Sequence, residues 1–250
     1  SSEISKKFDV KAFDDLNSIL EEVDALSIVT NTEYHYKIAE KCLKSKKHVF
    51  IEKPITAMIE EADKLLSMAE QNRVLIQVGH IERLNPALLA LNKYKIKPKF
   101  IEIQRLAPYT SRGTDVPVVL DKMIHDIDIL LSLVKVPIKK TQATGLSILT
   151  DSIDIAHARM RFEDGTVASV MSSRIARDEV RKIKIFQKDL YATLDLLIGS
   201  TEIYEVVNDK TSKYKMTIPF DYKGNTKLIG YHKPDLSKGD PLRIELENFI

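Results

Sequence analysis

The chain of 250 residues has little glycine and a single cysteine, Cys42. Its eight glycines are fewer than half of an average usage of about 7%. No two of them stand two positions apart, so the sequence contains no Gly-x-Gly loop of the kind that cradles a dinucleotide pyrophosphate. One cysteine excludes a disulfide framework, and the first residues lack the apolar core of a signal peptide. We therefore expect a reducing, cytoplasmic setting.

Long apolar runs and a charge excess are also missing. A typical apolar stretch, Ile127–Val134, is interrupted by Asp128 and Ser132 and is far shorter than the roughly 20 residues that span a bilayer. The formal net charge is +2, which gives no sign of nucleic-acid binding. We expect neither a membrane nor a nucleic-acid partner. The hydrophobic fraction of 44% is enough for a sizeable core in one large or two smaller domains.

The first half of the chain alternates short apolar runs with helix-compatible stretches. Buried strands followed by crossover helices have this pattern, and they form right-handed units on a parallel sheet. The strands are predicted at Asp24–Thr30, His48–Glu52 and Val74–Val78, and the helices at Glu33–Lys44 and Ile59–Gln71. The sequence therefore predicts a partial Rossmann-type α/β domain over residues 1–96, which closes with a helix from Asn85-Pro86 to about Tyr94.

The second half, residues 97–250, follows a different pattern. Phe100–Leu106 alternates strictly, which is typical of a strand with one wet face. Two further strands flank the hairpin signal Glu163-Asp164-Gly165. An α+β domain with an open, mainly antiparallel sheet is predicted. The two strands of the hairpin are Ile155–Phe162 and Thr166–Ser172. Further strands are expected at Arg181–Gln187, Leu190–Leu196, Ile203–Val207 and Tyr214–Ile218, and a last helix from Pro241 to Ile250.

The first candidate site is Glu52-Lys53-Pro54, at the carboxyl end of the second buried strand. Open α/β sheets place their ligands at this edge. A lysine there can be partly desolvated and can exchange a proton or a hydrogen bond with a substrate hydroxyl. A surface turn carrying a charged pair is the alternative, and spacing alone does not separate the two.

The second candidate is a helix that Pro117 opens. On an ideal helix Asp121, His125, Asp128 and Ser132 form one polar stripe, and Met123, Ile124, Ile127, Leu130 and Leu131 form the opposite, apolar face. Asp121 and His125 are one turn apart, so the carboxylate can orient the imidazole and raise its basicity, as a general base needs. An ordinary wet helix face is the alternative. Asp-x-x-x-His supplies only two ligands, so no metal site is expected.

A third candidate is Thr30-Asn31-Thr32-Glu33-Tyr34-His35, which follows the first buried strand. Small hydroxyl side chains at such a turn line a nucleotide site or cap the helix.

Together these segments resemble the Gfo/Idh/MocA family of NAD(P)-dependent oxidoreductases, named after glucose–fructose oxidoreductase, inositol dehydrogenase and rhizopine catabolism. The resemblance runs from about Lys11 to Ile250, and its specific marks are His48–Pro54, Gly79–Pro86 and the Asp121-x-x-x-His125 helix. Within the family, Leu120–Asp128 and Ser172–Arg177 resemble the branch of 3-dehydrogenases that act on UDP-linked N-acetyl amino sugars. The resemblance thus implies oxidation of a secondary alcohol of a sugar or nucleotide sugar by hydride transfer to NAD or NADP.

The resemblance also implies roles for single residues. Lys53, Asp121 and His125 match the family's catalytic positions, with His125 as the favoured base, Asp121 orienting it and Lys53 polarising the oxygen; the base and polarising roles are exchangeable. Arg83, Asn85 and Pro86 match a family motif after the third strand. A purely structural role, in which they shape the domain junction, is an equally good interpretation of these residues. The cofactor-binding positions are Thr30, Asn31, Thr32, His35, Glu52 and Lys53.

One departure from the family concerns the cofactor. Members begin with a strand, a Gly-x-Gly-x-x-Gly loop and a helix, and this chain starts after them. We therefore expect the chain by itself to bind NAD poorly and to be inactive, with the activity belonging to a longer parent. The rival hypothesis is a cofactor-free binding or oligomerisation module derived from the same fold.

Assembly is the last expectation. Few helices are predicted to cover the second sheet, so one face must be polar or paired with another subunit. Ile155–Phe162 has an apolar side and a side too charged for a dry core but suited to a partly apolar interface. We expect a homodimer or homotetramer through this face. The charged side consists of Ile155, His157, Arg159 and Arg161, and the apolar side of Ala156, Ala158, Met160 and Phe162.

Overall fold

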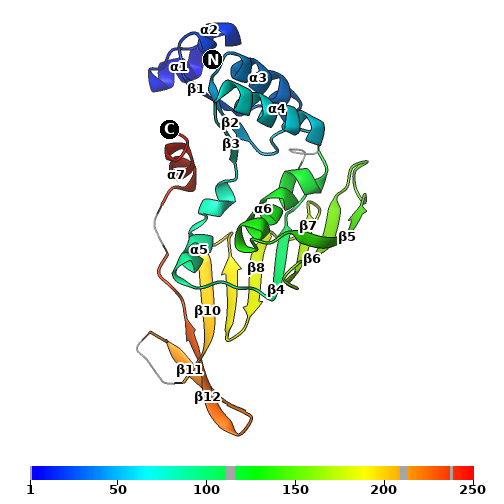
Figure 1. Cartoon of the computed structure of the whole chain (residues 1–250), viewed down its shortest axis with the longest axis vertical. Helices are drawn as coiled ribbons and strands as arrows, with labels where there is room; N and C mark the ends of the chain where they lie inside the picture. Colours follow the sequence, from blue (N-terminus) through cyan, green and yellow to red (C-terminus); the bar gives the residue numbers. More distant parts are fainter. Residues whose placement is uncertain (1, 111–115, 209–212, 237–238) are drawn as a thin grey trace. The chain divides into compact units, whose positions relative to one another are not determined.

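The computed structural model describes residues 2–110, 116–208, 213–236 and 239–250 (Figure 1). The chain forms two compact units, one from the residues up to Gly79 with Phe249, the other from His80–Asn248 with Ile250. The sequence analysis placed the boundary near Ile96. The units divide earlier because Asn85 and Ala87 already hydrogen-bond to the second sheet, through the carbonyl of Leu196 and the hydroxyl of Thr201.

The first unit is a three-stranded parallel sheet in the order β1-β2-β3, with helices α3 and α4 packed side by side and α3 lying against β1 and β2. The central strand β2 is apolar at three successive positions, all buried, as expected for a strand covered on both faces. This confirms the predicted partial Rossmann-type sheet. Its elements are α1 (Ser2–Phe8), α2 (Leu16–Leu20), β1 (Ala25–Ile28), α3 (Thr32–Lys44), β2 (His48–Glu52), α4 (Ile59–Asn72) and β3 (Ile76–Gly79).

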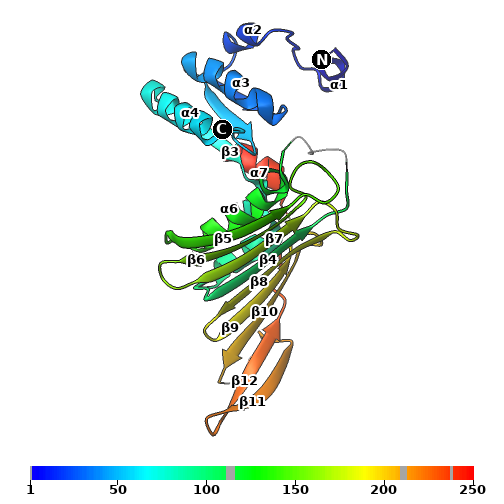
Figure 2. The same cartoon turned by 90° about the vertical axis from the view of Figure 1, so that its right-hand side faces the viewer.

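The second unit is built on a nine-stranded sheet in the order β11-β12-β10-β9-β8-β4-β7-β6-β5, drawn face-on in Figure 2. All neighbouring strands are antiparallel except β4 and β7, which run parallel in the middle of the sheet. The strands are β4 (Phe100–Leu106), β5 (Ile138–Leu146), β6 (Ile155–Phe162), β7 (Val167–Ser173), β8 (Val180–Gln187), β9 (Leu190–Asp195), β10 (Ser200–Val207), β11 (Met216–Tyr222) and β12 (Asn225–His232). The helical segments are η1 (Ile81–Leu84), α5 (Pro86–Leu89), η2 (Ala90–Lys93), η3 (Val119–Met123), α6 (Ile124–Leu133) and α7 (Pro241–Glu247).

One face of this sheet packs against α5 and α6 and holds the core of the unit. Alternate residues of the strands point into this core. Along β4, half-buried and buried residues therefore alternate strictly. The strict period of β4 and the apolar side of β6 were both predicted and are confirmed. The largest fully buried side chains of the core are Ile101, Ile103, Met123, Ile129, Leu130, Phe162, Ile183 and Ile185.

The opposite face of the sheet carries a row of aromatic rings. Successive ring centroids lie 5.9, 4.8, 5.5 and 5.0 Å apart, and the rings belong to residues directly opposite one another on neighbouring strands. His157, Arg159 and Arg161 of β6 are exposed on this side, as predicted. We call this the open face. Its aromatic row consists of Phe100, Phe186, Tyr191, Tyr204 and Tyr231.

Several predicted elements differ from those observed. The helix predicted up to Tyr94 is α5 followed by the 3-10 turn η2, and the last helix ends at Glu247 rather than Ile250. Two strands were missed. β5 is exposed along its whole length and rich in lysine and threonine, and β12 carries Gly230 in its interior, so neither shows a clear period-2 apolar pattern.

Candidate active site

Lys53 lies where the sequence placed it, immediately after β2 and half-buried. The peptide bond between Lys53 and Pro54 is cis. The backbone N–H of Lys53 donates to the carboxylate of Glu52 at 3.3 Å. Gly79 pairs with Glu52 across β2 and β3, and a side chain at Gly79 would approach the Glu52 carboxyl carbon to 3.2 Å. The end of β2 therefore presents Glu52 and Lys53 side by side at the carboxyl edge of the parallel sheet.

His35 joins the two loops that follow β1 and β2. Its side chain is buried in the first turn of α3, with Nδ1 2.8 Å from the carbonyl oxygen of Pro54 and Nε2 3.0 Å from that of Thr30. Both ring nitrogens contact backbone carbonyls. His35 can therefore affect cofactor binding only indirectly, by holding these two loops in place.

The turn between β1 and α3 has the features of a nucleotide-binding edge. Thr30 and Asn31 are exposed, Thr32 begins the helix, and the Asn31 side chain makes no capping hydrogen bond to the helix. The N–H groups of a first helical turn attract anionic groups and ribose or phosphate oxygens. These residues fit one side of a dinucleotide, whereas the glycine loop that meets the pyrophosphate does not occur in this sequence.

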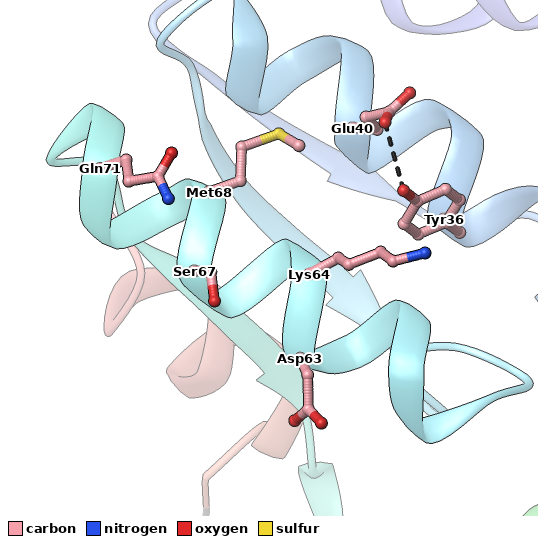
Figure 3. A pocket seen from close by; sticks show the side chains of 7 residues that line it. All are labelled: Tyr36, Glu40, Asp63, Lys64, Ser67, Met68 and Gln71. Carbon is pink, nitrogen blue, oxygen red and sulfur yellow. Dashed lines mark hydrogen bonds between the residues drawn. The ribbon is translucent and has the colours of Figure 1, made fainter.

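A groove in the first unit lies elsewhere (Figure 3). It runs between α3 and α4, and within it the hydroxyl of Tyr36 donates to Glu40 at 3.2 Å. None of the predicted site residues lines it. Its lining consists of Tyr36, Glu40, Asp63, Lys64, Ser67, Met68 and Gln71.

In the second unit, Asp121 lies in a π-helical turn and His125 in the first turn of the α-helix that follows. The N–H of Ile124 reaches back five residues to the carbonyl of Val119, which defines the turn. Such turns are rare and occur often at functional sites. Both side chains are half-buried, and the Asp121 carboxylate lies 3.3 Å from the ammonium of Lys122.

The π-turn changes which residues of α6 face the core. The ideal-helix prediction of a single polar stripe opposite an apolar face is wrong. Ile129 is fully buried and Leu131 is 42% exposed, while the carboxylates of Asp126 and Asp128 are buried. The extra residue in the turn shifts the phase of the helix, so a wheel drawn at 100° per residue from Asp121 misplaces the positions after it.

Asp126 meets a buried arginine from the sheet. The guanidinium of Arg105, on the core side of β4, donates from Nε to both oxygens of Asp126 at 3.0 Å, and from a second nitrogen to Glu82 at 2.9 Å. Burial raises the pKa of the Asp126 carboxyl, and the positive charge of Arg105 opposes that change. We call Arg105, Asp126 and Glu82 the Arg105 cluster. Ser172 and Arg181 complete it at 3.5 Å from Asp126 and Glu82 respectively.

A second arginine holds the other buried carboxylate of α6. Arg83 of η1 makes a two-pronged contact with Asp128, with Nε 2.6 Å from one oxygen and a terminal nitrogen 2.5 Å from the other. This hydrogen bonding raises the pKa of Arg83. Asn85 caps α5 through the N–H of Ala87 and donates to the Leu196 carbonyl. The Arg83 and Asn85 side chains therefore fix η1 to α6 and α5 to the end of β9.

The entry to the π-turn is fixed by Arg174 and Asp154. Arg174 donates to the carbonyls of Val116 and Ile153 at 2.8 Å each, and the N–H of Val118 donates to Ile153. Asp154 is fully buried and accepts the N–H groups of three successive residues, Ile148, Leu149 and Thr150, along with the Thr150 hydroxyl. The segment leading to Asp121 is thus attached to a rigid loop.

The sequence analysis missed Glu82, Arg105, Asp126, Asp154 and Arg174. One signal was present, because Arg105 occupies the core-facing phase of the alternating strand β4, where a charge needs a buried partner. Within the described ranges, no group of three or more histidine, cysteine, aspartate or glutamate side chains has the arrangement of a metal site. No helix in this part of the chain is long and apolar enough to cross a membrane.

Residues 1–80 match the sequence profile described as "Oxidoreductase family, NAD-binding Rossmann fold", and residues 102–189 match the Gfo/Idh/MocA C-terminal domain. The chain is 35% identical over 251 residues to UDP-N-acetylglucosamine 3-dehydrogenase of Acidithiobacillus ferrooxidans, which covers all of this chain and 76% of the relative. A solved structure of that relative superimposes with a TM-score of 0.86, over 99% of this chain and 75% of that one. The chain belongs to the Gfo/Idh/MocA family of oxidoreductases.

Other proteins match this chain at lower identity. Myo-inositol 2-dehydrogenase of Thermotoga maritima is 27% identical over 194 residues, which are 70% of this chain and 58% of that protein. Levoglucosan dehydrogenase in complex with NADH shares the fold with a TM-score of 0.82 at 17% identity, over 100% of this chain and 76% of that one. The family resemblance stated from the sequence is confirmed, as is its fold of a Rossmann-like unit and an open sheet.

Proposed function

We propose that the protein carrying this chain oxidises a secondary alcohol of a nucleotide-linked amino sugar at C3 and passes the hydride to NAD or NADP. The observation that carries the proposal is the 35% identity to UDP-N-acetylglucosamine 3-dehydrogenase along the whole chain. The matched region includes Lys53, Asp121 and His125, so each residue that the family resemblance assigns to catalysis is present. The chain spans about three quarters of that relative and 50 to 58% of the next two.

The protein must take the hydroxyl proton as the hydride leaves. His125 is the proposed base, because an imidazole titrates near neutral pH and sits half-buried at the start of α6. Asp121 is proposed to hold the ring in the tautomer that accepts the proton. Lys53 donates a hydrogen bond to the substrate oxygen and stabilises its negative charge as the proton departs.

The bound cofactor supplies the hydride acceptor. Thr30, Asn31 and Thr32 of the β1–α3 turn would hold one side of it, and Glu52 at the end of β2 would lie near its nicotinamide. His35 keeps the two loops at a fixed separation through its contacts with Thr30 and Pro54. This division of roles is consistent with the exposure of Thr30 and Asn31 and the burial of His35.

We also propose that the open face pairs with a second copy of the chain, giving a homodimer or a homotetramer. The aromatic row supports this, because tyrosine and phenylalanine are enriched in interface cores. A sheet face of stacked rings flanked by arginines has the composition of a hydrogen-bonded, partly apolar interface. The homotetramer would need a second interface besides this face.

The proposal is tested with the full-length protein by following NADH formation with UDP-N-acetylglucosamine, and with UDP-glucose and myo-inositol as alternatives. We expect turnover with the amino sugar, and a loss of about 100-fold or more in kcat for Lys53→Ala and for His125→Ala. Lys41→Ala, an exposed lysine on α3, is the matched control for Lys53, and His157→Gln on β6 is the control for His125. Near wild-type turnover in His125→Ala would overturn the assignment of the base, and absence of turnover on all three compounds would overturn the substrate class.

A further inference from the structure

Helix α6 is held to its surroundings by two directional contacts within three residues. Asp126 binds Arg105 of β4, and Asp128 binds Arg83 of η1, each through two or more hydrogen bonds. Apolar contacts alone allow a helix to rotate or slide on a sheet, since they have little directional preference. A carboxylate whose two oxygens are both held by one guanidinium is restricted in position and in orientation.

The chemistry of the Arg105 cluster is unusual for a purely stabilising contact. The side chains of Arg105 and Asp126 are 6% and 1% exposed, and Glu82 is 11% exposed. A buried ion pair of this kind is often no more stabilising than apolar side chains of the same volume, because both charges have been removed from water. What the cluster adds is registry: β4, η1 and α6 have one mutual arrangement that satisfies all three charges.

The residue whose setting depends most directly on this arrangement is His125, the chain neighbour of Asp126. With side chains, a helix has a radius of about 5 to 6 Å, so a rotation of about 10° moves a side-chain tip by about 1 Å. A misplacement of that size in a catalytic group is enough to lower a rate by about 100-fold. In the π-turn immediately before α6, the N–H of Ile124 bonds to the carbonyl five residues back, so the regular α-helical hydrogen-bond pattern does not continue from α6 into this turn.

We propose that the Arg105 cluster is a positioning device for His125, in which Arg105 fixes the rotation of α6 through Asp126 and Glu82 fixes the guanidinium. This inference rests on the proposed role of His125 as the base. Arg105, Asp126 and Glu82 are positioning residues and need not touch substrate or cofactor.

The test compares two variants of the full-length protein. Asp126→Asn removes the charge at constant shape. Arg105→Met combined with Asp126→Leu removes both charges of this pair and keeps the volume, a replacement that buried ion pairs often tolerate. Glu82 then keeps its ion pair with Arg181 at 3.5 Å. Both are expected to lower kcat by about 10- to 100-fold with a change in KM of no more than about threefold. Leu194→Ala in β9, which creates a core cavity away from α6, is the control for reduced thermal stability alone and should keep its kcat.

A second readout does not depend on turnover. In protein with 15N-labelled histidine, the ring signals of His125, assigned with His125→Gln, are expected to shift or broaden in both variants, while those of His157 stay unchanged. Unaltered His125 signals together with unaltered kcat in the paired variant would show that the cluster is structural only, and would overturn the inference. If His125→Ala keeps its turnover, the proposed base is wrong, and the His125 signals alone then decide whether the cluster positions this ring.

Discussion

The ring of His35 lies 2.8 Å from the carbonyl oxygen of Pro54, on the far side of the cis peptide bond from Lys53. The other ring nitrogen lies 3.0 Å from the Thr30 carbonyl. Both neighbours accept hydrogen bonds, and a neutral imidazole can donate to only one of them, whereas an imidazolium donates to both. A single buried side chain thus joins the ends of β1 and β2.

Replacing His35 by phenylalanine should therefore disturb both loops at once. His35→Phe removes the ring nitrogens that contact the carbonyls of buried Pro54 and of Thr30. Loss of the donor to a buried carbonyl costs about 1 to 3 kcal/mol. We expect a lower urea midpoint and a higher KM for the cofactor. His35→Gln, which keeps an N–H donor, should lose less. Equal stability of His35→Phe and wild type would contradict the bridging role.

The proposed orientation of His125 by Asp121 predicts a specific kinetic phenotype. Asp121→Asn should lower kcat by about 10- to 100-fold, because the amide holds the ring less basic and in mixed tautomers. The acidic limb of the kcat/KM profile should move to lower pH, since the imidazole loses its negative neighbour. Lys122→Ala removes the ion-pair partner of Asp121 and serves as the control for the charge of this turn. An unchanged pH profile in Asp121→Asn would argue that Asp121 acts in another way.

Asp154 makes the stability of the second unit depend on pH. Burial alone would raise the pKa of this carboxyl, but the N–H groups of Thr150, Leu149 and Ile148 and the Thr150 hydroxyl together hold it well below its usual range. A carboxyl whose folded pKa lies below its unfolded value of about 3.9 stabilises the fold above that value and loses its contribution as the pH falls through it.

Asp154→Asn should consequently lower the urea midpoint at neutral pH and flatten the fall in stability below about pH 5. Asp164→Asn is a useful comparison, because the pKa of Asp164 is also lowered, by the N–H and hydroxyl of Thr166, at an exposed hairpin. Urea unfolding at several pH values measures both. If Asp154→Asn retains the wild-type pH slope, another group governs acid unfolding.

The assembly proposal predicts that charge on the aromatic row dissociates the protein. Tyr191→Asp with Tyr204→Asp places two carboxylates side by side in the centre of the open face. Light scattering coupled to size exclusion should then report a lower mass than wild type. Tyr34→Asp, at a more exposed tyrosine on α3 with 49% exposure, should leave the mass unchanged. A wild-type protein that is monomeric at micromolar concentration would overturn the proposal.

The sequence predicted those parts of the fold that have a strong local period. β2 was placed at His48–Glu52 and β6 at Ile155–Phe162, with the bounds that the structure has. Strand β5 was not predicted, because an edge strand exposed on both sides has no alternation of apolar and polar residues. The sequence did not predict which residues of α6 face the core, because a helical wheel assumes a regular α-helix and does not allow for a π-turn. Local pattern therefore located Asp121 and His125 on their helix but not the direction in which that helix faces.

The residues around the site were harder to predict than the site itself. Arg105, Asp126 and Glu82 meet only after β4, α6 and η1 have packed, and no spacing along the chain links them. Their burial offered the only local clue, a charge on the apolar side of β4. Whether Lys53 and His125 act on one substrate stays a prediction that the kinetic variants test.

The parallel pairing of β4 with β7 has a consequence for how the second unit reaches its native state. β4 occupies the middle of the sheet, yet both of its neighbours, β7 and β8, come later in the sequence, beyond α6 and the hairpins of β5 and β6. Its edges stay unpaired until those strands have been synthesised and have folded, and pairings at long sequence separation form slowly. Arg105 lies on this strand, so the part of its surroundings that the sheet supplies is complete only when β7 and β8 have paired with β4.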